Sequence, residues 1–384
     1  MSFIINAIRG RTMRFALVGT GHMAQEHIRT LALVPGHDVV ALVDPVAASL
    51  EWARRSLAGT GYPAPHAVPG FADVPSMLDA VRADAVIVAS PNHTHHRVLE
   101  PLLATDLHIL CEKPLCTTMA DAQDIVRRSQ GRKGIVWVGM EYRFMPPIAR
   151  FIEDIHAGRT GVLRRVALHE HRFPFLDKVG DWNRFNRNTG GTMVEKCCHF
   201  FDLMRTIVRA EPVRVFCSGA ADVNHLDERY GGERPDILDN SYTIVDFDNG
   251  VRAMLDLCMF ADGSEEQEQL VAIGDRAKLE VGIPSGVVTW SPRVPPHAPK
   301  PVTRERIAVR EDVLAAGHHH GATYFQLLAF LEAAAGHRPV QVTPHDGLVA
   351  VAMGTAAEIS AREKRVVQIS ELVTLEPRAA GAAS

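Results

Sequence analysis

The sequence lacks the features that mark membrane, secreted and nucleic-acid-binding proteins. No apolar run in its 384 residues approaches the roughly 18 residues that a bilayer-spanning helix needs. The first twelve residues contain neither the apolar segment nor the small-residue cleavage site of a secretory signal. The formal net charge of -4 provides no excess of basic groups for nucleic acid or an anionic membrane. We therefore expect a cytoplasmic protein with no membrane or nucleic-acid partner.

Cysteine is sparse, and the six cysteines form no CxxC pair and no small-domain disulfide framework. This favours a reducing compartment. Histidine clusters at 93–96 and 318–320 raise the question of a metal site. Neither cluster has the cysteine or carboxylate spacing of a zinc site, so we expect no metal and favour solvated or substrate-lining histidines.

The chain is too long for one ordinary hydrophobic core. Its composition, 46% hydrophobic and 22% charged, is typical of a globular protein. No internal repeat is visible. We expect a flexible extension over residues 1–12, a first domain over 13–142, a second domain over 143–375 and a disordered tail over 376–384.

Residues 13–44 have the pattern of a dinucleotide-binding unit. A short apolar run at 15–18 predicts a buried parallel strand, and a helix is predicted over 25–33. Between them lies Gly19-Thr20-Gly21-His22-Met23-Ala24, which fits G-x-G-x-x-G/A. Here the first glycine allows the tight turn, the second lets the backbone approach a pyrophosphate, and the alanine lets the helix pack on the strand. A second strand, over 39–43, ends in Asp44, an acid placed to bind ribose hydroxyls.

This order of elements makes an unrelated glycine turn the weaker alternative. The amides at the start of the helix are expected to receive the phosphates. Because the carboxylate of Asp44 would repel a 2′-phosphate, we expect NAD in preference to NADP. The residues of this unit expected to bind the cofactor are Gly19, Thr20, Gly21, His22, Met23 and Asp44.

Strands and helices continue to alternate as far as Gly139, which predicts a doubly wound parallel sheet with right-handed crossovers. Further strands are predicted over 85–89, 107–111 and 134–139, with helices over 45–57, 73–81, 94–104 and 120–129. Two of these strands deliver polar segments, Ser90-Pro91-Asn92 and Glu112-Lys113-Pro114, to the sheet edge where ligands bind in such folds.

Beyond Arg143 the hydrophobic pattern changes to alternation with a period of two, which predicts an open, mostly antiparallel sheet. A helix is predicted over 148–157, and strands over 165–171, 213–218, 241–247, 251–260, 269–274, 277–281 and 286–290. Helices over 322–335 and 344–363 and a strand over 366–369 follow. The expected fold class is therefore α/β, with a Rossmann domain followed by an α/β domain.

A second group of candidate residues lies in the segment 188–202. If one helix begins at Thr192, then Glu195, His199 and Asp202 share one face. A carboxylate beside an imidazole orients it and raises its basicity, which suits a general base. The alternative is a helix whose histidine only packs. The glycines at 190 and 191 are expected to let the backbone approach a ligand.

Lys113 is open to two interpretations. A lysine at a loop tip is usually solvated. Lys113, however, precedes Pro114 and lies at the sheet edge where the cofactor is expected. There its ammonium group can polarise a substrate hydroxyl and adjust the pKa of a base.

These motifs, in this order, resemble the Gfo/Idh/MocA family, the relatives of glucose-fructose oxidoreductase and inositol dehydrogenase. The resemblance extends from about Met13 to Ile369 and includes Ser90-Pro91-Asn92 with His95, the Tyr142-Arg143-Phe144 segment and the closing helices. It implies an N-terminal Rossmann domain, a C-terminal domain whose open sheet supports a homodimer or homotetramer, and oxidation of a ring hydroxyl on a sugar or cyclitol.

The resemblance also implies catalytic roles for Lys113, for His199 and for the acid four residues before it, Glu195. The sequence departs from the family at this acid, which is usually aspartate, and at Cys197, where glycine is usual. Further cofactor contacts are expected from Ser90, Asn92, His95, Glu112 and Lys113. Substrate contacts are expected from Arg143, Arg184, Lys196, Asp202 and His199.

The leading hypothesis is an NAD-dependent dehydrogenase. In it His199, steadied by Glu195, removes the hydroxyl proton, Lys113 stabilises the alkoxide, and hydride passes to nicotinamide. The alternative, known among relatives of this family, is a redox-neutral glycosidase that oxidises the sugar transiently, eliminates the aglycone and reduces the product. A non-enzymatic cofactor sensor would leave the convergence of Lys113 and His199 unexplained.

Basic residues crowd the segments expected to line the substrate: Arg143, Arg172, Arg184, Arg187 and Lys196. Guanidinium groups near a sugar site suit a carboxylate, sulfonate or phosphate. We therefore expect an acidic sugar or its glycoside to be used better than a neutral one. Solvated or acid-paired arginines, the common situation in proteins, are the alternative.

Overall fold

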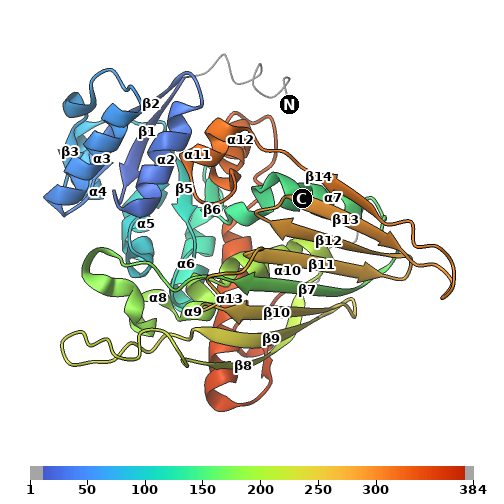
Figure 1. The fold of residues 1–384 in the computed structure, drawn as a ribbon. Helices are drawn as coiled ribbons and strands as arrows, with labels where there is room; N and C mark the ends of the chain where they lie inside the picture. Colours follow the sequence, from blue (N-terminus) through green and yellow to red (C-terminus); the bar gives the residue numbers. More distant parts are fainter. Residues whose placement is uncertain (1–11, 377–384) are drawn as a thin grey trace.

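The computed structural model describes residues 12–376 as two β-sheets joined side by side and covered by helices (Figure 1). The predictions of a flexible extension and a disordered tail fall on residues outside this range, except at Thr12 and Glu376. No helix among the described residues combines the length and the apolar character that crossing a bilayer requires.

The first sheet has six parallel strands in the order β3-β2-β1-β4-β5-β6, which confirms the predicted doubly wound sheet. The strand order reverses between β1 and β4, and ligands bind at such a point. The strands are β1 (Met13–Val18), β2 (His37–Val43), β3 (Gly70–Phe71), β4 (Ala85–Val88), β5 (His108–Glu112) and β6 (Val136–Gly139). The helices between them are α2 (His22–Ala32), α3 (Ala47–Gly59), α4 (Val74–Ala80), α5 (His95–Leu103) and α6 (Met119–Ser129).

The second sheet has nine strands in the order β14-β13-β12-β11-β7-β10-β9-β8-β15. All neighbours pair antiparallel except β7 and β10, so the sheet is mostly antiparallel, as predicted. The strands are β7 (Leu163–His171), β8 (Pro212–Ala220), β9 (Asn240–Phe247), β10 (Arg252–Cys258), β11 (Glu268–Gly274), β12 (Ala277–Ile283), β13 (Val287–Pro292), β14 (Thr303–Arg306) and β15 (Val367–Gln368).

Helices cover one face of the second sheet, and the other face is open. Apolar side chains from α7 (Pro146–His156), α10 (Cys198–Val208) and α13 (Pro344–Glu363) form a core with the inward side chains of its strands. Every second residue of β7, β9 and β10 faces this core. The intervening residues form what we call the outer face of the sheet.

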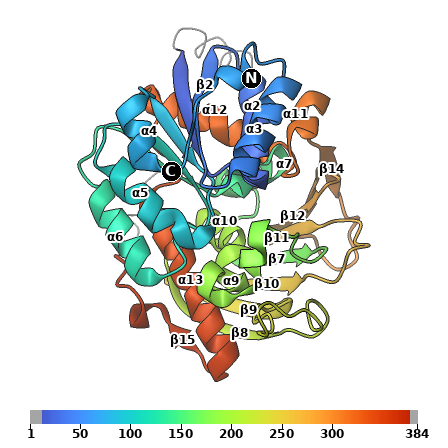
Figure 2. The same ribbon diagram turned by 90° about the vertical axis from the view of Figure 1, so that its left-hand side faces the viewer.

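The last part of the chain joins the two sheets. The helix α13 packs against α6 of the first sheet and against α10 and β8 of the second, as Figure 2 shows. The helix α12 (Ala322–Ala334) packs against α2, and its apolar side chains belong to the core of the first sheet. The first core therefore includes residues from far beyond the expected boundary at 142.

The sequence analysis missed the short helices α8 (Asn186–Thr189) and α11 (Glu311–Ala316) and the strand β14, and it expected α9 (Thr192–Glu195) only as the start of a longer helix. Elements of four to six residues span too little chain to show a helical period. All four residues of β14 are exposed, so this edge strand has no alternation of buried and exposed positions.

Gly354 lets α13 lie close to α9, so we predict that Gly354→Ala destabilises the fold. A Cβ atom there would lie 2.6 Å from the Met193 carbonyl oxygen and 2.9 Å from Val194 Cα. Relieving such a clash should lower the free energy of unfolding by about 1–3 kcal/mol, measured in urea. In the matched control, Gly59→Ala, the new Cβ meets nothing within 4 Å. This control should leave stability equal or raise it by up to about 1 kcal/mol. Equal urea midpoints for the two variants would contradict the close packing of α13 on α9.

Candidate active site

The glycine turn after β1 is packed on one side and open on the other. Gly19 has a positive φ of 82°, and a Cβ atom there would lie 2.4 Å from the backbone nitrogen of Ser90. A Cβ atom on Gly21 would meet nothing within 4 Å. Gly21 is also the N-cap of α2 and makes no side-chain cap. The turn therefore leaves space and free helix amides where a pyrophosphate would bind.

Asp44 is fixed beside this turn at the end of β2. Its Oδ2 atom accepts hydrogen bonds from the Thr20 backbone nitrogen at 2.9 Å and from Thr20 Oγ1 at 3.1 Å. Its Oδ1 atom accepts from the Val46 nitrogen at 2.9 Å. The exposed His22 ring packs edge-on against Trp52 with ring centroids 4.9 Å apart. The turn and the acid thus fit a dinucleotide cofactor.

Two of the expected cofactor residues after β4, His95 and Asn92, differ in their surroundings. His95 is fully buried, with Nδ1 2.8 Å from the Pro114 carbonyl oxygen and Nε2 3.0 Å from the Ser90 carbonyl oxygen. Both ring nitrogens thus face backbone carbonyl oxygens and the ring joins two loops, which argues against the expected cofactor contact. Asn92 instead has a buried side-chain nitrogen with no hydrogen-bond partner among residues 12–376.

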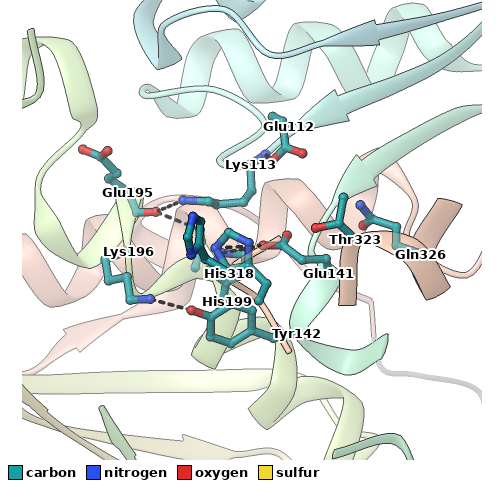
Figure 3. A network of polar contacts seen from close by, with 12 residues as sticks. Glu112, Lys113, Glu141, Tyr142, Glu195, Lys196, His199, His318, Thr323 and Gln326 are labelled. Carbon is teal, nitrogen blue, oxygen red and sulfur yellow. Dashed lines mark hydrogen bonds and ion pairs between the residues drawn. The ribbon is translucent and has the colours of Figure 1, made fainter. Parts of the chain in front are cut away.

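Glu112 and Lys113 lie together at the end of β5, and their side chains point in different directions (Figure 3). Glu112 Oε1 lies 2.7 Å from Nε2 of His27 on α2, so this carboxylate holds the helix. Lys113 Nζ donates to the carbonyl oxygen of Glu195 at 3.1 Å. Burial lowers the pKa of Lys113, but nearby acidic groups, among them Glu195 and Glu141, outweigh burial and leave the pKa above its usual range. The group is therefore an ammonium ion at neutral pH.

The predicted single helix from Thr192 is broken, and this changes the role of Glu195. The helix α9 ends at Glu195, and α10 begins only at Cys198, with Cys197 as its N-cap. The Glu195 carboxylate makes no hydrogen bond to His199, and its Oε2 atom is buried without a partner within the described chain. Burial raises the pKa of Glu195. The predicted pairing of Glu195 with His199 is therefore wrong, because the kink turns the two residues apart.

His199 is held by an aromatic ring and faces a different acid. Its ring stacks on that of Tyr142, with centroids 4.0 Å apart and an interplanar angle of 8°. Its Nε2 atom lies 3.7 Å from Glu141 Oε1, and its Nδ1 atom has no hydrogen-bond partner among the residues described. Burial and the ammonium groups of Lys113 and Lys196 hold the pKa of His199 well below its usual range. The imidazole is thus neutral, the form that accepts a proton.

Glu141 stands at the centre of an acid–histidine chain that the sequence analysis missed, although neither of its carboxylate oxygens makes a hydrogen bond within residues 12–376. The Nε2 atom of His319 lies 4.0 Å from Glu141 Oε1, and its Nδ1 atom lies 3.1 Å from Glu26 Oε1. Thr323 of α12 also donates to Glu26, at 2.6 Å. Burial raises the pKa of Glu141 to about 7, and the nearby Glu112 carboxylate adds to this rise. The Glu141 carboxyl therefore holds its proton more strongly than an ordinary glutamate does.

The pKa of His319 is set by the same two effects, burial and a nearby carboxylate. Burial lowers its pKa, but the adjacent Glu26 carboxylate outweighs burial, and the net pKa is raised. The only hint in the sequence was the histidine run at 318–320, which was considered for metal rather than for proton exchange.

Lys196 was expected to contact substrate, and it is instead enclosed by protein groups. Its Nζ atom lies 2.8 Å from Glu170 Oε1 on β7. It also donates to the Tyr142 hydroxyl at 2.6 Å, as Figure 3 shows. Burial lowers its pKa, although Glu170 opposes this effect. Lys196 thus positions the ring on which His199 stacks.

The arginines expected to recognise an anion are paired with acids, which was the alternative interpretation. Arg143 forms an ion pair with Asp202, so neither of these two expected substrate residues is free. Arg184 is 1% exposed and pairs with Asp177 and Glu228. The remaining pairs are Arg172 with Glu170 and Arg187 with Glu233. The expected preference for an acidic sugar therefore loses the observation that motivated it.

Gly190 and Gly191 pack against the chain itself rather than opening onto a ligand. A Cβ atom on Gly190 would lie 2.8 Å from the Thr117 carbonyl oxygen, and one on Gly191 would lie 2.2 Å from Glu358 Oε1. Both glycines have positive φ angles. They allow α9 to fit between the loop after β5 and α13, which corrects the expected approach to a ligand.

Two family models match most of the chain. Residues 13–140 match the NAD-binding Rossmann fold of the oxidoreductase family, and residues 152–369 match that family's C-terminal α/β domain. Both models bear the family name that the sequence motifs suggested.

Individual relatives agree with these matches. The chain is 32% identical over 199 residues to the rhizopine catabolism protein MocA of Rhizobium meliloti, covering 52% of this chain and 58% of that protein. It is 28% identical over 359 residues to inositol 2-dehydrogenase 1 of Saccharopolyspora erythraea, covering 90% of this chain and 93% of that protein. A solved levoglucosan dehydrogenase, in complex with NADH and levoglucosan, shares the fold with a TM-score of 0.79, 17% identity and coverage of 94% and 100%. The chain belongs to the Gfo/Idh/MocA family of NAD-binding oxidoreductases.

Proposed function

We propose that the protein is an NAD-dependent dehydrogenase that oxidises a ring hydroxyl of a neutral sugar or cyclitol. The observation that carries this proposal is the meeting of a charged Lys113, a neutral His199 and the ionisable Glu141 beside a cofactor-binding sheet edge. The names of relatives, which include an inositol dehydrogenase and a levoglucosan dehydrogenase, point to the same class of substrate.

In the proposed mechanism the chain's own residues manage the proton and the charge. His199 accepts the hydroxyl proton, and the Lys113 ammonium group stabilises the negative charge that develops on the substrate oxygen. The bound NAD supplies the hydride acceptor. Residues of the glycine turn with Asp44 would hold its diphosphate and ribose, and Asn92 offers a further buried donor.

Glu141 has a supporting role in this mechanism. Once it is ionised, its carboxylate faces Nε2 of His199 and stabilises the imidazolium that forms. His319 lies on the other side of the same carboxylate and leads to Glu26. We propose that this acid–histidine chain takes over the role first expected of Glu195, since the Glu195 carboxylate makes no hydrogen bond to His199 and its carbonyl oxygen accepts from Lys113.

The outer face of the second sheet supports the expected homodimer or homotetramer. Large hydrophobic side chains are exposed there on two adjacent strands, Phe216 on β8 and Tyr242 and Ile244 on β9. Such exposed apolar groups favour contact with another chain. The number of chains in the assembly stays a prediction.

The reaction type can be tested with a panel of free sugars, cyclitols and aryl glycosides, read at once for NADH absorbance and for released phenol. We expect NADH from a free sugar or cyclitol and no phenol. Lys113→Met should abolish turnover while NADH still binds, because the glycine turn and Asp44 hold most of the cofactor and the ammonium group stabilises the substrate oxygen. Phenol released without net NADH would contradict the dehydrogenase and identify the redox-neutral glycosidase.

We predict that Asp44→Ser narrows the preference for NAD over NADP in kcat/KM by at least about tenfold, because the variant lacks the negative charge that repels the 2′-phosphate. Asp38→Ser is the matched control, since Asp38 is an exposed acid at the opposite end of the same strand. Its cofactor preference should not change. Equal use of NAD and NADP by the unmodified protein would rule out this role of Asp44.

We predict a step in kcat near pH 7 that Glu141→Gln removes. The pKa of Glu141 is raised to about 7, so the carboxyl is neutral below this pH and charged above it. Because only the charged form stabilises protonated His199, kcat should rise with pH through this range. The variant should lack this rise and lose about tenfold or more in kcat above pH 7. The exposed Glu153→Gln serves as control and should keep the step. An unchanged profile in Glu141→Gln would exclude Glu141 from the proton path.

A further inference from the structure

Three side chains with metal-ligating atoms meet on the outer face of the second sheet. His169 and His171 belong to β7, and Asp256 lies on the neighbouring strand β10. Their nearest ligand atoms all lie within 4.8 Å of one another. The sequence analysis considered only the two other histidine clusters and expected no metal, because residues on separate strands show no ligand spacing in the sequence.

Strand geometry places these groups together. Residues 169 and 171 are two apart on one strand, so both point to the same face of the sheet. Asp256 is the register partner of His169 in the parallel pairing of β7 with β10. Glu170, between the two histidines, points to the opposite face and reaches Lys196. The cluster is therefore separate from the candidate active site.

The distances suit a first-row transition metal. Nδ1 of His169 and Nε2 of His171 each lie 3.3 Å from the same atom, Oδ2 of Asp256. In a tetrahedral site with bonds of about 2.0–2.1 Å, two ligand atoms are about 3.3–3.4 Å apart. Two of the three separations thus already equal an edge of such a tetrahedron. The third stays below 4.8 Å and would close by small rotations of the histidine side chains.

The types of ligand narrow the choice of ion. Two imidazole nitrogens and one carboxylate oxygen are the ligands that zinc, cobalt and nickel ions prefer, whereas magnesium and calcium prefer oxygen alone. Three protein ligands leave a position for water. In the single chain the side chains of His169, His171 and Asp256 are 28%, 36% and 17% exposed, so an ion can reach them there. Cys258, the register partner of His171, is a partly exposed neighbour on the same face.

We propose that His169, His171 and Asp256 form a binding site for a divalent transition metal ion, such as zinc, that bridges β7 and β10. An ion at this place links the only parallel pair of strands among those the structure describes in the second sheet. Because such an ion binds the folded chain and not the unfolded one, it stabilises the fold.

The test uses the full chain without an affinity tag, treated with a chelator and then titrated with Co²⁺ or Zn²⁺. We expect one ion per chain by elemental analysis, a visible Co²⁺ spectrum of a four-coordinate site, and a rise of several degrees in Tm. Mg²⁺ at the same concentration should not change Tm. Half an ion per chain would mean that two chains share the ion and would overturn a site built within one chain.

The variants separate this site from other histidines. His171→Asn and Asp256→Asn should each weaken Co²⁺ binding by more than about 100-fold, above the loss from removing a merely supporting residue. His66→Asn, at an exposed histidine elsewhere, is the matched control and should bind normally. Circular dichroism and Tm without metal establish that each variant is folded.

Two results would overturn the proposal even if metal binds. Binding that survives in His171→Asn but is lost in His319→Asn would place the ion in the active-site acid–histidine chain. Binding that is lost in Cys258→Ser alone would assign it to the thiol. Absence of binding at micromolar free Co²⁺ would overturn it outright.

Discussion

Lys196 is buried where the two sheets meet, and its ammonium group needs partners there because a buried charge without them costs several kcal/mol. Glu170 supplies the negative charge from β7, and Tyr142 supplies a hydroxyl oxygen from the segment after β6. These two contacts of one ammonium group therefore tie the second sheet to the end of the first. It also fixes the plane of the Tyr142 ring, and with it the orientation of His199. A glutamate on a sheet strand thus controls the geometry of the proposed base without touching it.

The electrostatics around His199 separate the acid and base roles. Burial and two nearby ammonium groups lower the pKa of the His199 imidazole and keep it neutral. Burial and a second carboxylate raise the pKa of Glu141. Lys113 remains charged because acids surround it. Groups whose environments push their pKa values in opposite directions are the usual sign of assigned acid and base roles in an active site. These charged groups lie together because a buried charge is costly without a partner of opposite charge.

The alternation of strands and helices up to residue 139 and the period-two runs beyond it were enough to predict both sheets. Lys113 and His199 could also be proposed as catalytic residues from the sequence, because motifs surround them. The acid that faces His199, Glu141, could not be predicted from the sequence. Nothing in the residues around Cys197, neither glycine nor proline, signals the kink that turns Glu195 away. Glu141 reads as an ordinary acid at a strand end, and it becomes buried only because α12 and the histidines before it fold back over the first sheet. Such long-range burial has no local signature in the sequence.

The packing of α12 on α2 has a consequence for how the protein is made. The apolar face of the nucleotide-binding sheet leaves the ribosome first, but part of its core consists of side chains between Val313 and Ala350. Glu26 likewise finds His319 and Thr323 only after 293 and 297 further positions of the chain have been made. Chains generally fold domain by domain from the N-terminus as they emerge. Here the core of the first domain is complete only after the residues up to Ala350 have been added. During this interval part of the apolar core surface is exposed, so the nascent chain needs protection from aggregation.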